Sequence, residues 1–371
     1  MDDSDPDLLP EGLEDRLPRE AAATARVLRG VTDTLHAHGY DRVLPPMIEF
    51  ERSLAARMAG IQSRRMFRFV DPASLRMMAL RSDVTPQVGR IATTRLADAP
   101  RPLRLCYAGQ VVTIKGDGLD PARERLQCGA ELIGSDSVAA ASEIVAIAVE
   151  AALAAGATGV SVDFTLPDLV DTLAGSALPL PPEKIAGVRR ELDSKDAGGL
   201  VEAGGEAYVP LLYAAGNFET AIERLEAIDA GRALAGRIAA LREIVVRVGA
   251  AVRFTLDPSE RHGFEYQTWF GFTLYADGVR GALGRGGTYR IAGANGGEVA
   301  TGFSIYPDAL VALGADEAAE DKLFLPAGHD ADAAARLRAI GWRTVAALSD
   351  ADDAAALGCT HVLGSDGPVR L

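Results

Sequence analysis

The spacing of apolar and polar positions in the first part of the chain predicts a helix followed by short extended segments. Apolar residues recur at helical spacing over residues 18–38, and Gly39 has the residue type that ends a helix. Short strands are expected within Tyr40–Phe50 and at Met77–Leu80. Thr85 is expected to cap a helix that begins at Pro86.

Residues 103–114 and 124–133 are predicted to form an antiparallel pair of strands. Alternation in the second strand places two sets of side chains on opposite faces. An amide, a glycine gap and a carboxylate on one face can bind a small, polar, basic ligand, although a solvated strand face has the same pattern. The apolar face carries Leu126, Cys128, Ala130 and Leu132, and the polar face carries Gln127, Gly129 and Glu131.

The rest of the chain alternates between helical and extended patterns. A helix is expected over Ser137–Ala155, and residues 166–249 are mostly helical. The sequence Gly284–Gly287 is interpreted as a tight turn or bulge, because no lysine and helix start follow it. A second block of strands is expected at Val252–Leu256, Phe264–Tyr275, Val279–Leu283 and Val299–Ile305.

These elements predict an α+β fold with an antiparallel sheet and flanking helices. Residues 1–165 and 250–315 are expected to form the core, and residues 166–249 a helical insertion. Residues 316–371 are expected to form a small α/β domain in the order strand, helix, strand, helix, strand.

Composition narrows the classes of function. The chain has 371 residues, 48% of them hydrophobic, and a mean hydropathy of +0.08, which is typical of a globular protein. A formal net charge of −14 opposes nonspecific attraction to nucleic acid. The acidic start of the chain is unlike a signal peptide, and no apolar run is long enough to span a bilayer. We therefore expect a cytoplasmic protein with no membrane partner.

The cysteines and histidines show no metal-binding or redox spacing. Three cysteines are widely separated, and the five histidines form no His-Glu-x-x-His pattern. We therefore expect no structural metal, no disulfide framework and no cofactor.

Two segments together resemble a known family. Residues 80–88 read Leu-Arg-Ser-Asp-Val-Thr-Pro-Gln-Val, and residues 127–131 read Gln-Cys-Gly-Ala-Glu. These motifs resemble those of class II histidyl-tRNA synthetases. They resemble more closely the non-synthetase relative of those enzymes, the regulatory subunit of ATP phosphoribosyltransferase. The likeness runs in order over nearly all of residues 8–313, which implies a class II synthetase-like fold.

The resemblance implies a pocket for L-histidine. Asp83 and Thr85 match the residues that hold the α-amino group, and Gln127 and Glu131 match those that line the imidazole site. Carboxylate and hydroxyl acceptors suit an ammonium group, and an imidazole has two ring nitrogens to bind. For Asp83 and Thr85 the alternative interpretation is an ordinary helix start.

A third element, which contains Tyr266 and Gln267, resembles a pocket signature of the histidyl enzymes only in degraded form, with Tyr266 still in a position to line the pocket. Gln267 stands where they carry a second tyrosine, which leaves a different amino acid open as the ligand. For Tyr266, Trp269 and Tyr289 two interpretations are open, packing within strands and contact with a ligand.

Catalytic positions of the resembled synthetases carry other residues in this chain. Thr113 stands where an arginine contacts the α-phosphate of ATP, and Ala309 stands where an arginine clamps ATP. Loss of two such contacts at about 3 kcal/mol each slows adenylation by roughly four orders of magnitude. We therefore expect no synthetase activity. The C-terminal residues are too few for a complete anticodon-binding domain, so no tRNA partner is expected either.

The resemblance thus implies a non-catalytic subunit of ATP phosphoribosyltransferase, required for the first step of histidine biosynthesis and mediating feedback inhibition by L-histidine. Two sites are open for the inhibitor, the pocket described above and the subunit interface. The expected partners of this chain are a short-form catalytic subunit and a second copy of itself, through the class II motif 1 region at roughly Val27–Glu49. The rival hypotheses are a divergent active histidyl-tRNA synthetase and an adenylate-forming ligase for another amino acid.

Overall fold

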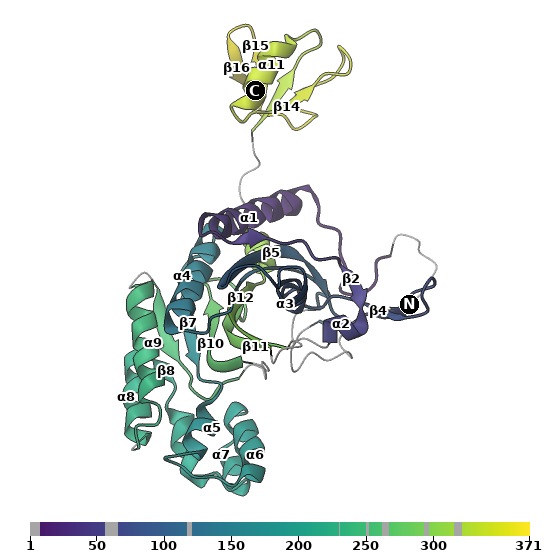
Figure 1. Ribbon diagram of the computed structural model, residues 1–371. Helices are drawn as coiled ribbons and strands as arrows, with labels where there is room; N and C mark the ends of the chain where they lie inside the picture. Colours follow the sequence, from purple (N-terminus) through teal and green to yellow (C-terminus); the bar gives the residue numbers. More distant parts are fainter. Residues whose placement is uncertain are drawn as a thin grey trace. The chain divides into compact units, whose positions relative to one another are not determined.

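The computed structural model of the protein describes residues 8–55, 66–116, 121–229, 231–249, 252–261, 267–292, 297–314 and 321–371. The chain divides into two compact units, Met1–Ala315 and Asp316–Leu371 (Figure 1). Among the described helices, none combines the length and hydropathy needed to cross a membrane.

Nine strands of the described residues form one large sheet in the first unit. In chain order they are β1 (Asp41–Arg42), β5 (Leu103–Val112), β6 (Glu124–Ile133), β7 (Ser161–Thr165), β8 (Gly216–Asn217), β9 (Arg253–Leu256), β10 (Gln267–Tyr275), β11 (Gly284–Ile291) and β12 (Glu298–Ile305). Their order across the sheet is β1-β5-β6-β12-β11-β10-β7-β9-β8. Two pairs, β1 with β5 and β7 with β9, are parallel, and the other neighbours are antiparallel.

A smaller sheet precedes the pocket residues in the chain. It has the order β2-β4-β3, with β2 at Ile48–Phe50, β3 at Arg68–Val70 and β4 at Met77–Leu80. The short helix α2 (Glu51–Ala55) follows β2 directly. The proline pair Pro45-Pro46 separates β1 from β2, as expected for residues that cannot donate to a sheet ladder.

The two faces of the large sheet have different neighbours. Helices α1 (Pro18–Ala37) and α4 (Val138–Ala154) pack on one face, and α3 (Thr85–Thr94) lies on the other, within the curve of the sheet in Figure 1. Both α1 and α4 agree with the sequence pattern, and the Ser137 hydroxyl caps α4 by accepting a hydrogen bond from the Ala140 N–H.

The strand β6 contributes to both faces. Its apolar side chains, Leu126, Cys128, Ala130 and Leu132, belong to the main hydrophobic core. Gln127 and Glu131 point the other way and are 0% and 1% exposed. The predicted alternation is confirmed, and the alternative of a solvated strand face is wrong. Buried polar groups of this kind require hydrogen-bond partners, which the α3 side of the sheet provides.

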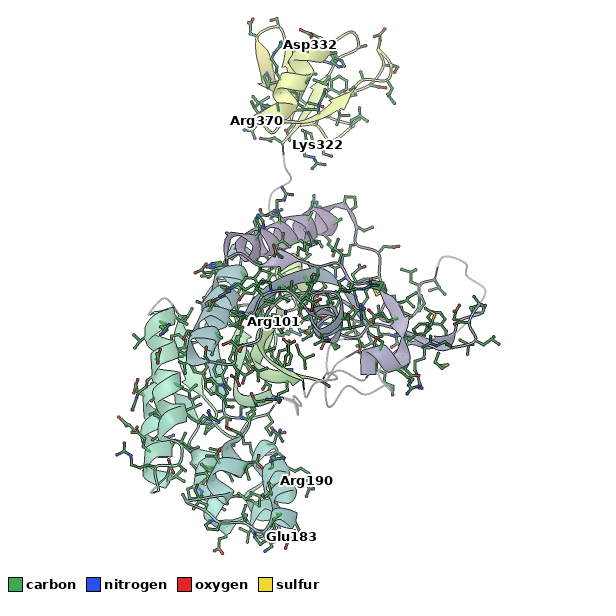
Figure 2. The ribbon with its side chains drawn as sticks, in the orientation of Figure 1. Arg101, Glu183, Arg190, Lys322, Asp332 and Arg370 are labelled. Carbon is green, nitrogen blue, oxygen red and sulfur yellow. The ribbon has the colours of Figure 1, made fainter. Side chains whose placement is uncertain are left out.

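Residues 166–249 form a helical segment that packs against the core. Its elements are α5 (Leu169–Ala174), α6 (Pro182–Asp193), α7 (Ala197–Glu202), the 3₁₀ helix Glu206–Tyr213, β8, α8 (Phe218–Ile228) and α9 (Ala235–Val248). Apolar residues of these helices join the main hydrophobic cluster of the sheet. Charged side chains such as Glu183 and Arg190 project outward (Figure 2).

One strand of the second block lies later in the chain than expected. Val279–Leu283 is a loop, and the glycine-rich sequence Gly284–Gly287 opens β11. The expected turn at Gly284–Gly287 is therefore wrong. Neighbouring strands are crowded there, because a Cβ at Gly286 would lie 2.4 Å from the Phe272 ring. The irregularity in pairing falls in β10 between Gln267 and Gly271.

The described part of the second unit, residues 321–371, forms a four-stranded sheet with one helix. Its strands are β13 (Lys322–Leu325), β14 (Arg343–Ala346), β15 (His361–Gly364) and β16 (Gly367–Arg370), in the order β14-β13-β15-β16. The helix α11 (Ala331–Ala339) confirms the first helix expected in this part. The second expected helix is wrong, because the Asp352 carboxylate accepts hydrogen bonds from the backbone N–H groups of Leu348 and Ser349, which favours turns.

Candidate functional site

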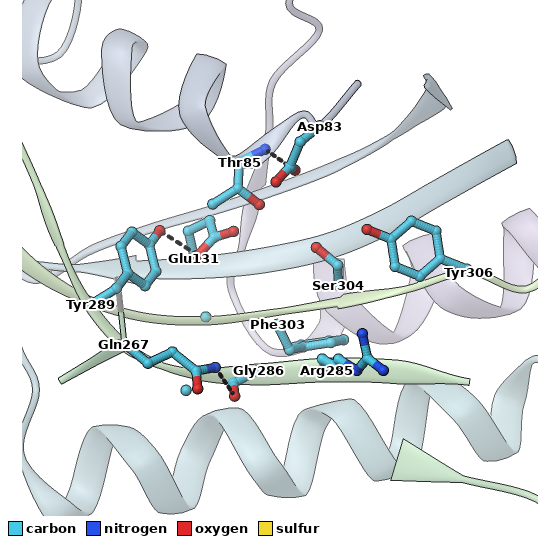
Figure 3. A pocket seen from close by; sticks show the side chains of 12 residues that line it. Asp83, Thr85, Glu131, Gln267, Arg285, Gly286, Tyr289, Phe303, Ser304 and Tyr306 are labelled. Atoms are coloured by element: carbon cyan, nitrogen blue, oxygen red, sulfur yellow. Dashed lines mark hydrogen bonds between the residues drawn. The ribbon is translucent and has the colours of Figure 1, made fainter. Parts of the chain in front are cut away.

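A small polar pocket lies between α3 and the large sheet (Figure 3). Its volume is about 40 Å³. The lining residues come from β6, β10, β11, β12, the start of α3 and the chain just before α3 and just after β12: Asp83, Thr85, Glu131, Gln267, Arg285, Gly286, Gly287, Tyr289, Gly302, Phe303, Ser304 and Tyr306.

Asp83 and Thr85 stand together at the start of α3. The Thr85 N–H donates to Asp83 Oδ1 at 2.9 Å, and Val84 occupies the capping position without a side-chain hydrogen bond. The expected role of Thr85 as the N-cap is therefore wrong, because the Asp83 carboxylate already accepts the backbone N–H. As a result, the Thr85 hydroxyl points to Tyr107 Oη, 3.0 Å away.

The loop before α3 is held by Arg81. This side chain is 7% exposed, and it donates to the carbonyl oxygens of Gln110 (2.7 Å) and Pro45 (2.9 Å). Burial lowers the pKa of its guanidinium. Gly109 leaves room for it, since a Cβ there would lie 2.3 Å from Arg81 Nη2. Arg81 therefore fixes the backbone that presents Asp83.

Gln127 bridges α3 and the far side of the pocket. Its Oε1 accepts from the Val84 N–H at 2.9 Å, and its Nε2 donates to Asp83 Oδ1 and Ser304 Oγ, each at 2.8 Å. Because the Val84 N–H is only a donor, these contacts determine which end of the amide is oxygen. The amide occupies the space between Asp83 and the sheet.

Glu131 lies at the bottom of the pocket, 1% exposed. Tyr289 Oη donates to its Oε2 at 2.6 Å, and Tyr107 Oη donates to its Oε1 at 3.3 Å. Gly302, opposite Glu131 on β12, leaves room for the carboxylate, because a Cβ there would lie 1.6 Å from Oε2. Burial, reinforced by the charge of Asp83, raises the pKa of Glu131 to about 8.

Gln267 lines the pocket from β10, and its Nε2 donates to the Gly286 carbonyl at 2.9 Å. It lies beside glycines on β10 and β11, where a Cβ at Gly271 would come within 2.5 Å of Oε1. Tyr266, the other residue expected from this element, lies outside the described residues. Of the other aromatic residues weighed for ligand contact, Tyr289 lines the pocket, and Trp269 donates from Nε1 to the Asp136 carbonyl.

Sequence reasoning missed two hydroxyl groups at the centre of the site. Tyr107, Gly129 and Ser304 stand opposite one another on β5, β6 and β12. The gap at Gly129 is filled by the phenol of Tyr107, whose Oη would lie 2.5 Å from a Cβ at 129. The sequence predicted that a ligand, rather than a side chain of the protein, would approach this gap. The pairing of a large residue with a glycine was visible in the sequence, but it became informative only with the strand register.

The two positions where synthetases carry ATP-binding arginines lie on different elements of this structure. The Thr113 hydroxyl donates to the Lys115 carbonyl at 2.9 Å in the turn after β5, and Ala309 lies in α10 (Asp308–Gly314). Arg285, which sequence reasoning did not single out, lines the pocket from β11 next to Ser304 (Figure 3). A guanidinium is therefore present at the pocket rim.

The pocket lining carries two acidic side chains and one arginine, Arg285. Asp83 and Glu131 both face the pocket, and in the part of the chain that the structure describes neither has a salt bridge to arginine or lysine. A bound cation would stabilise both carboxylates. Among the described residues, no group of three or more His, Cys, Asp or Glu side chains is placed to hold a metal ion.

Comparison with known proteins identifies the family. The family model for histidyl-tRNA synthetase matches residues 12–310. The chain is 43% identical to an ATP phosphoribosyltransferase regulatory subunit of Paramagnetospirillum magneticum, with 98% of each chain covered. It is 42% identical to the ATP phosphoribosyltransferase regulatory subunit of Rhodospirillum centenum, and the alignment covers 96% of this chain and 94% of the relative.

Solved structures show the same fold. An ATP phosphoribosyltransferase regulatory subunit/histidyl-tRNA synthetase of Bacillus halodurans superposes with a TM-score of 0.82 at 23% identity, covering 96% of this chain and 97% of the other. A histidyl-tRNA synthetase of Nostoc gives 0.79 at 16% identity, covering 97% and 92%. The fold class expected from the sequence is confirmed, and the chain belongs to the ATP phosphoribosyltransferase regulatory subunit family, which has the class II histidyl-tRNA synthetase fold.

Proposed function

We propose that this protein is a non-catalytic regulatory subunit of ATP phosphoribosyltransferase and that it binds L-histidine in the pocket between α3 and the sheet. The observation that carries the proposal is the pair of carboxylates Asp83 and Glu131, both turned into one pocket and neither paired with a cation among the described residues. The names of relatives at 43% and 42% identity support the regulatory role.

The two carboxylates match the two ends of histidine. Asp83 and the Thr85 hydroxyl can accept hydrogen bonds from an α-ammonium group. Glu131 has a pKa of about 8, so near neutral pH it can donate a proton to a ring nitrogen or accept one from it. Binding requires Gln127 to exchange its contact with Asp83 for contacts with the ligand.

The lack of catalysis follows from the residues at the positions where synthetases bind ATP. Thr113 donates within its own turn, and neither it nor Ala309 can contact a phosphate as a guanidinium does. Arg285 is the cation at the pocket rim. A single guanidinium does not replace the two contacts, so adenylation is slower by orders of magnitude.

Regulation would act by linkage to a short-form catalytic subunit. If histidine binds the inhibited assembly more tightly than the active one, it shifts the assembly by that difference in affinity. Self-association is proposed through the motif 1 region at roughly Val27–Glu49, and the protein is proposed to act in the cytoplasm without tRNA.

Co-expression tests the regulatory role. The chain is produced with a short-form phosphoribosyltransferase subunit, and activity is measured for each chain alone and for both together, with and without histidine. We expect activity that requires both chains and falls when histidine is added. Failure of the two chains to form a complex would contradict the proposal.

Calorimetry tests the pocket. Glu131→Ala should weaken histidine binding about a hundredfold, because a charge-assisted contact and a buried partner are lost. Glu143→Ala is the matched control, since Glu143 contacts Arg104 and Tyr40 away from the pocket lining. Equal affinity of wild type and Glu131→Ala would remove histidine from this site.

A divergent synthetase is the second candidate, and Arg285 at the pocket is the observation that favours it. Histidine-dependent exchange of pyrophosphate into ATP measures this activity directly. We expect no exchange above background. Exchange that disappears in Arg285→Ala would establish the synthetase, and ATP binding without histidine binding would indicate a ligase for another amino acid.

A further inference from the structure

The hydrogen bonds of the pocket form one connected path between its two carboxylates. Gln127 Nε2 donates to Asp83 Oδ1 and to Ser304 Oγ, each at 2.8 Å. Ser304 Oγ lies 2.8 Å from Tyr107 Oη, and Tyr107 Oη lies 3.3 Å from Glu131 Oε1. The path therefore joins the start of α3 to the bottom of the pocket through three strands.

The direction of this path follows from counting donors and acceptors. Since Gln127 Oε1 accepts the Val84 N–H, its amino group must be the donor to Ser304. When Glu131 is ionised it can only accept, so the Tyr107 hydroxyl donates its proton to Glu131. Tyr107 Oη then accepts from the Ser304 hydroxyl and from the Thr85 hydroxyl, which lies 3.0 Å away.

The strand register explains why these hydroxyls meet. Tyr107 on β5 and Ser304 on β12 stand on either side of Gly129 on β6. Any side chain at Gly129 would occupy the position of the Tyr107 hydroxyl, which would lie 2.5 Å from its Cβ. The missing side chain thus lets two residues from non-adjacent strands form a hydrogen bond.

We propose that Ser304 and Tyr107 are positioning residues that couple Asp83 to Glu131, so that the contacts of a ligand with one carboxylate change the hydrogen bonding of the other. A ligand ammonium that takes Asp83 from Gln127 releases the Gln127 amide. The amide then changes its bond to Ser304, and Ser304 passes the change to Tyr107 and Glu131. A ligand that carries two separated basic groups therefore binds the pocket more tightly than the summed binding free energies of its two fragments would give.

Glu131 is the group on which the coupling is measured. Burial raises its pKa to about 8, and the hydrogen bond from Tyr107 opposes that rise. The other groups that act on it are Tyr289 of β11 and Thr85 of α3, whose hydrogen bonds lower the pKa, and Asp83 before α3, whose charge raises it. The strand β12 faces it with Gly302, which carries no charge.

The test measures thermal or denaturant stability of the full ligand-free chain against pH, in wild type, Tyr107→Phe, Ser304→Ala and the double variant. Each is compared with the same protein carrying Glu131→Gln, and the difference isolates the titration of Glu131. Tyr107→Phe should raise its midpoint by roughly one pH unit. Ser304→Ala should raise it by a smaller amount, and Ser304→Thr, which keeps the hydroxyl, should restore the wild-type midpoint.

The decisive comparison is the effect of Ser304→Ala in the two backgrounds. Because Ser304 reaches Glu131 through Tyr107, its removal should shift the midpoint in wild type and leave it unchanged in Tyr107→Phe. Equal shifts in both backgrounds, or no shift in wild type, would overturn the coupling. Ser304→Ala removes one oxygen, so it still tests the proposal if Tyr107→Phe folds poorly.

Matched controls remove similar groups elsewhere. Tyr40→Phe deletes a buried hydroxyl that donates to Glu143 at 2.9 Å, and Ser142→Ala deletes a buried hydroxyl that donates to the Val138 carbonyl at 2.7 Å. Neither should move the Glu131 midpoint. A shift as large as that of Tyr107→Phe would mean that lost stability alone moves it, which would overturn the proposal.

Histidine affinity gives the second readout, which rests on the proposed function. Calorimetry should show about tenfold weaker histidine binding in Tyr107→Phe, with a smaller loss for imidazole, which reaches only one end of the pocket. If the ligand-free midpoints shift as expected but histidine does not bind, the coupling holds and the proposed function fails. If histidine binds but the midpoints do not shift, the proposed function holds and the coupling fails.

Discussion

Glu143 and Glu131 lie on opposite sides of the β5–β6 pair. Both accept hydrogen bonds from tyrosine hydroxyls, but their pKa values shift in opposite directions. Glu143 of α4 accepts hydrogen bonds from Arg104 at 2.7 and 2.8 Å and from Tyr40 at 2.9 Å. The hydrogen bonds from Arg104 lower its pKa. Glu131 of β6 also accepts hydrogen bonds from tyrosine hydroxyls, but burial raises its pKa to about 8, and no cation of the described residues pairs with it.

The difference shows what each site is built to hold. Glu143 already has its cation, so it connects α4 to β5 and Tyr40. Glu131 is inside the protein beside a second carboxylate, and this arrangement costs stability unless a ligand supplies the missing positive charge. Both glutamates contact a tyrosine, so the tyrosine does not distinguish the two roles. The arginine that contacts Glu143, Arg104, distinguishes them.

The largest expected effect is on the pH dependence of stability. Glu131 has a folded-state pKa of about 8 against an ordinary value of 4.5, so the folded protein holds a proton that the unfolded chain has released. The contribution of this bound proton to the free energy of unfolding is therefore fully present below pH 4.5. It is lost as the pH rises towards 8, at up to roughly 1.4 kcal/mol for each pH unit. Denaturant unfolding of wild type and Glu131→Gln measures it, and parallel curves would contradict the assignment.

Histidine affinity should have a plateau rather than a single midpoint. The complex holds one proton shared between Glu131 and the imidazole, whose own pKa is about 6.5. Between about 6.5 and the Glu131 value of about 8, the free partners together hold one proton, so binding exchanges none. Affinity should fall up to about tenfold for each pH unit outside this window. Calorimetry in buffers of different ionisation enthalpy checks this, and proton exchange on the plateau would refute it.

Glu143→Gln should have a smaller effect of the opposite sign. The lowered pKa of Glu143 means that its contribution is present above pH 4.5 and is lost as the pH falls through the lower folded value. Its side chain is 30% exposed and that of Arg104 34%, so solvent screening limits the loss at neutral pH to about 1 kcal/mol. Unfolding should show this loss near pH 7 and none in strong acid. A loss that persists in acid would mean that packing, not charge, is responsible.

Tyr40→Phe should have the smallest effect. It removes one hydrogen bond to a carboxylate that keeps Arg104, and the phenyl ring still fills the core position, so the cost is about 1 kcal/mol or less. Histidine affinity should be unchanged, because Glu143 does not line the pocket. A fall in affinity would show that the two sides of β5–β6 are coupled.

Much of the fold was readable from local patterns. The period-two alternation of β6 separated its apolar residues from Gln127 and Glu131, and the 3.6-residue periods of α1 and α4 located the helices that cover the apolar side. Errors occurred where tertiary contacts override propensity. Glycines formed the first residues of β11, because neighbouring strands leave no room for side chains, and turns around Asp352 replaced a helix.

Of the expected pocket residues, Asp83, Thr85, Glu131 and Gln267 line one pocket, and Gln127 joins two of its walls. Tyr107 and Ser304 were missed because each looks like an ordinary strand residue. Only the pairing of three strands places their hydroxyls together across Gly129.

The sequence by itself determined which side chains each strand and helix could offer, because backbone periodicity depends on local geometry. It also determined the family, through motifs that occur in a constant order. Tertiary structure decided the state of those side chains. The Asp83 carboxylate accepts the Thr85 N–H, and Tyr107 fills the space at Gly129. Among the described residues Glu131 has no paired cation, while Glu143 receives Arg104. Burial and pairing depend on residues distant in the chain, so the charge of a carboxylate is a property of the fold.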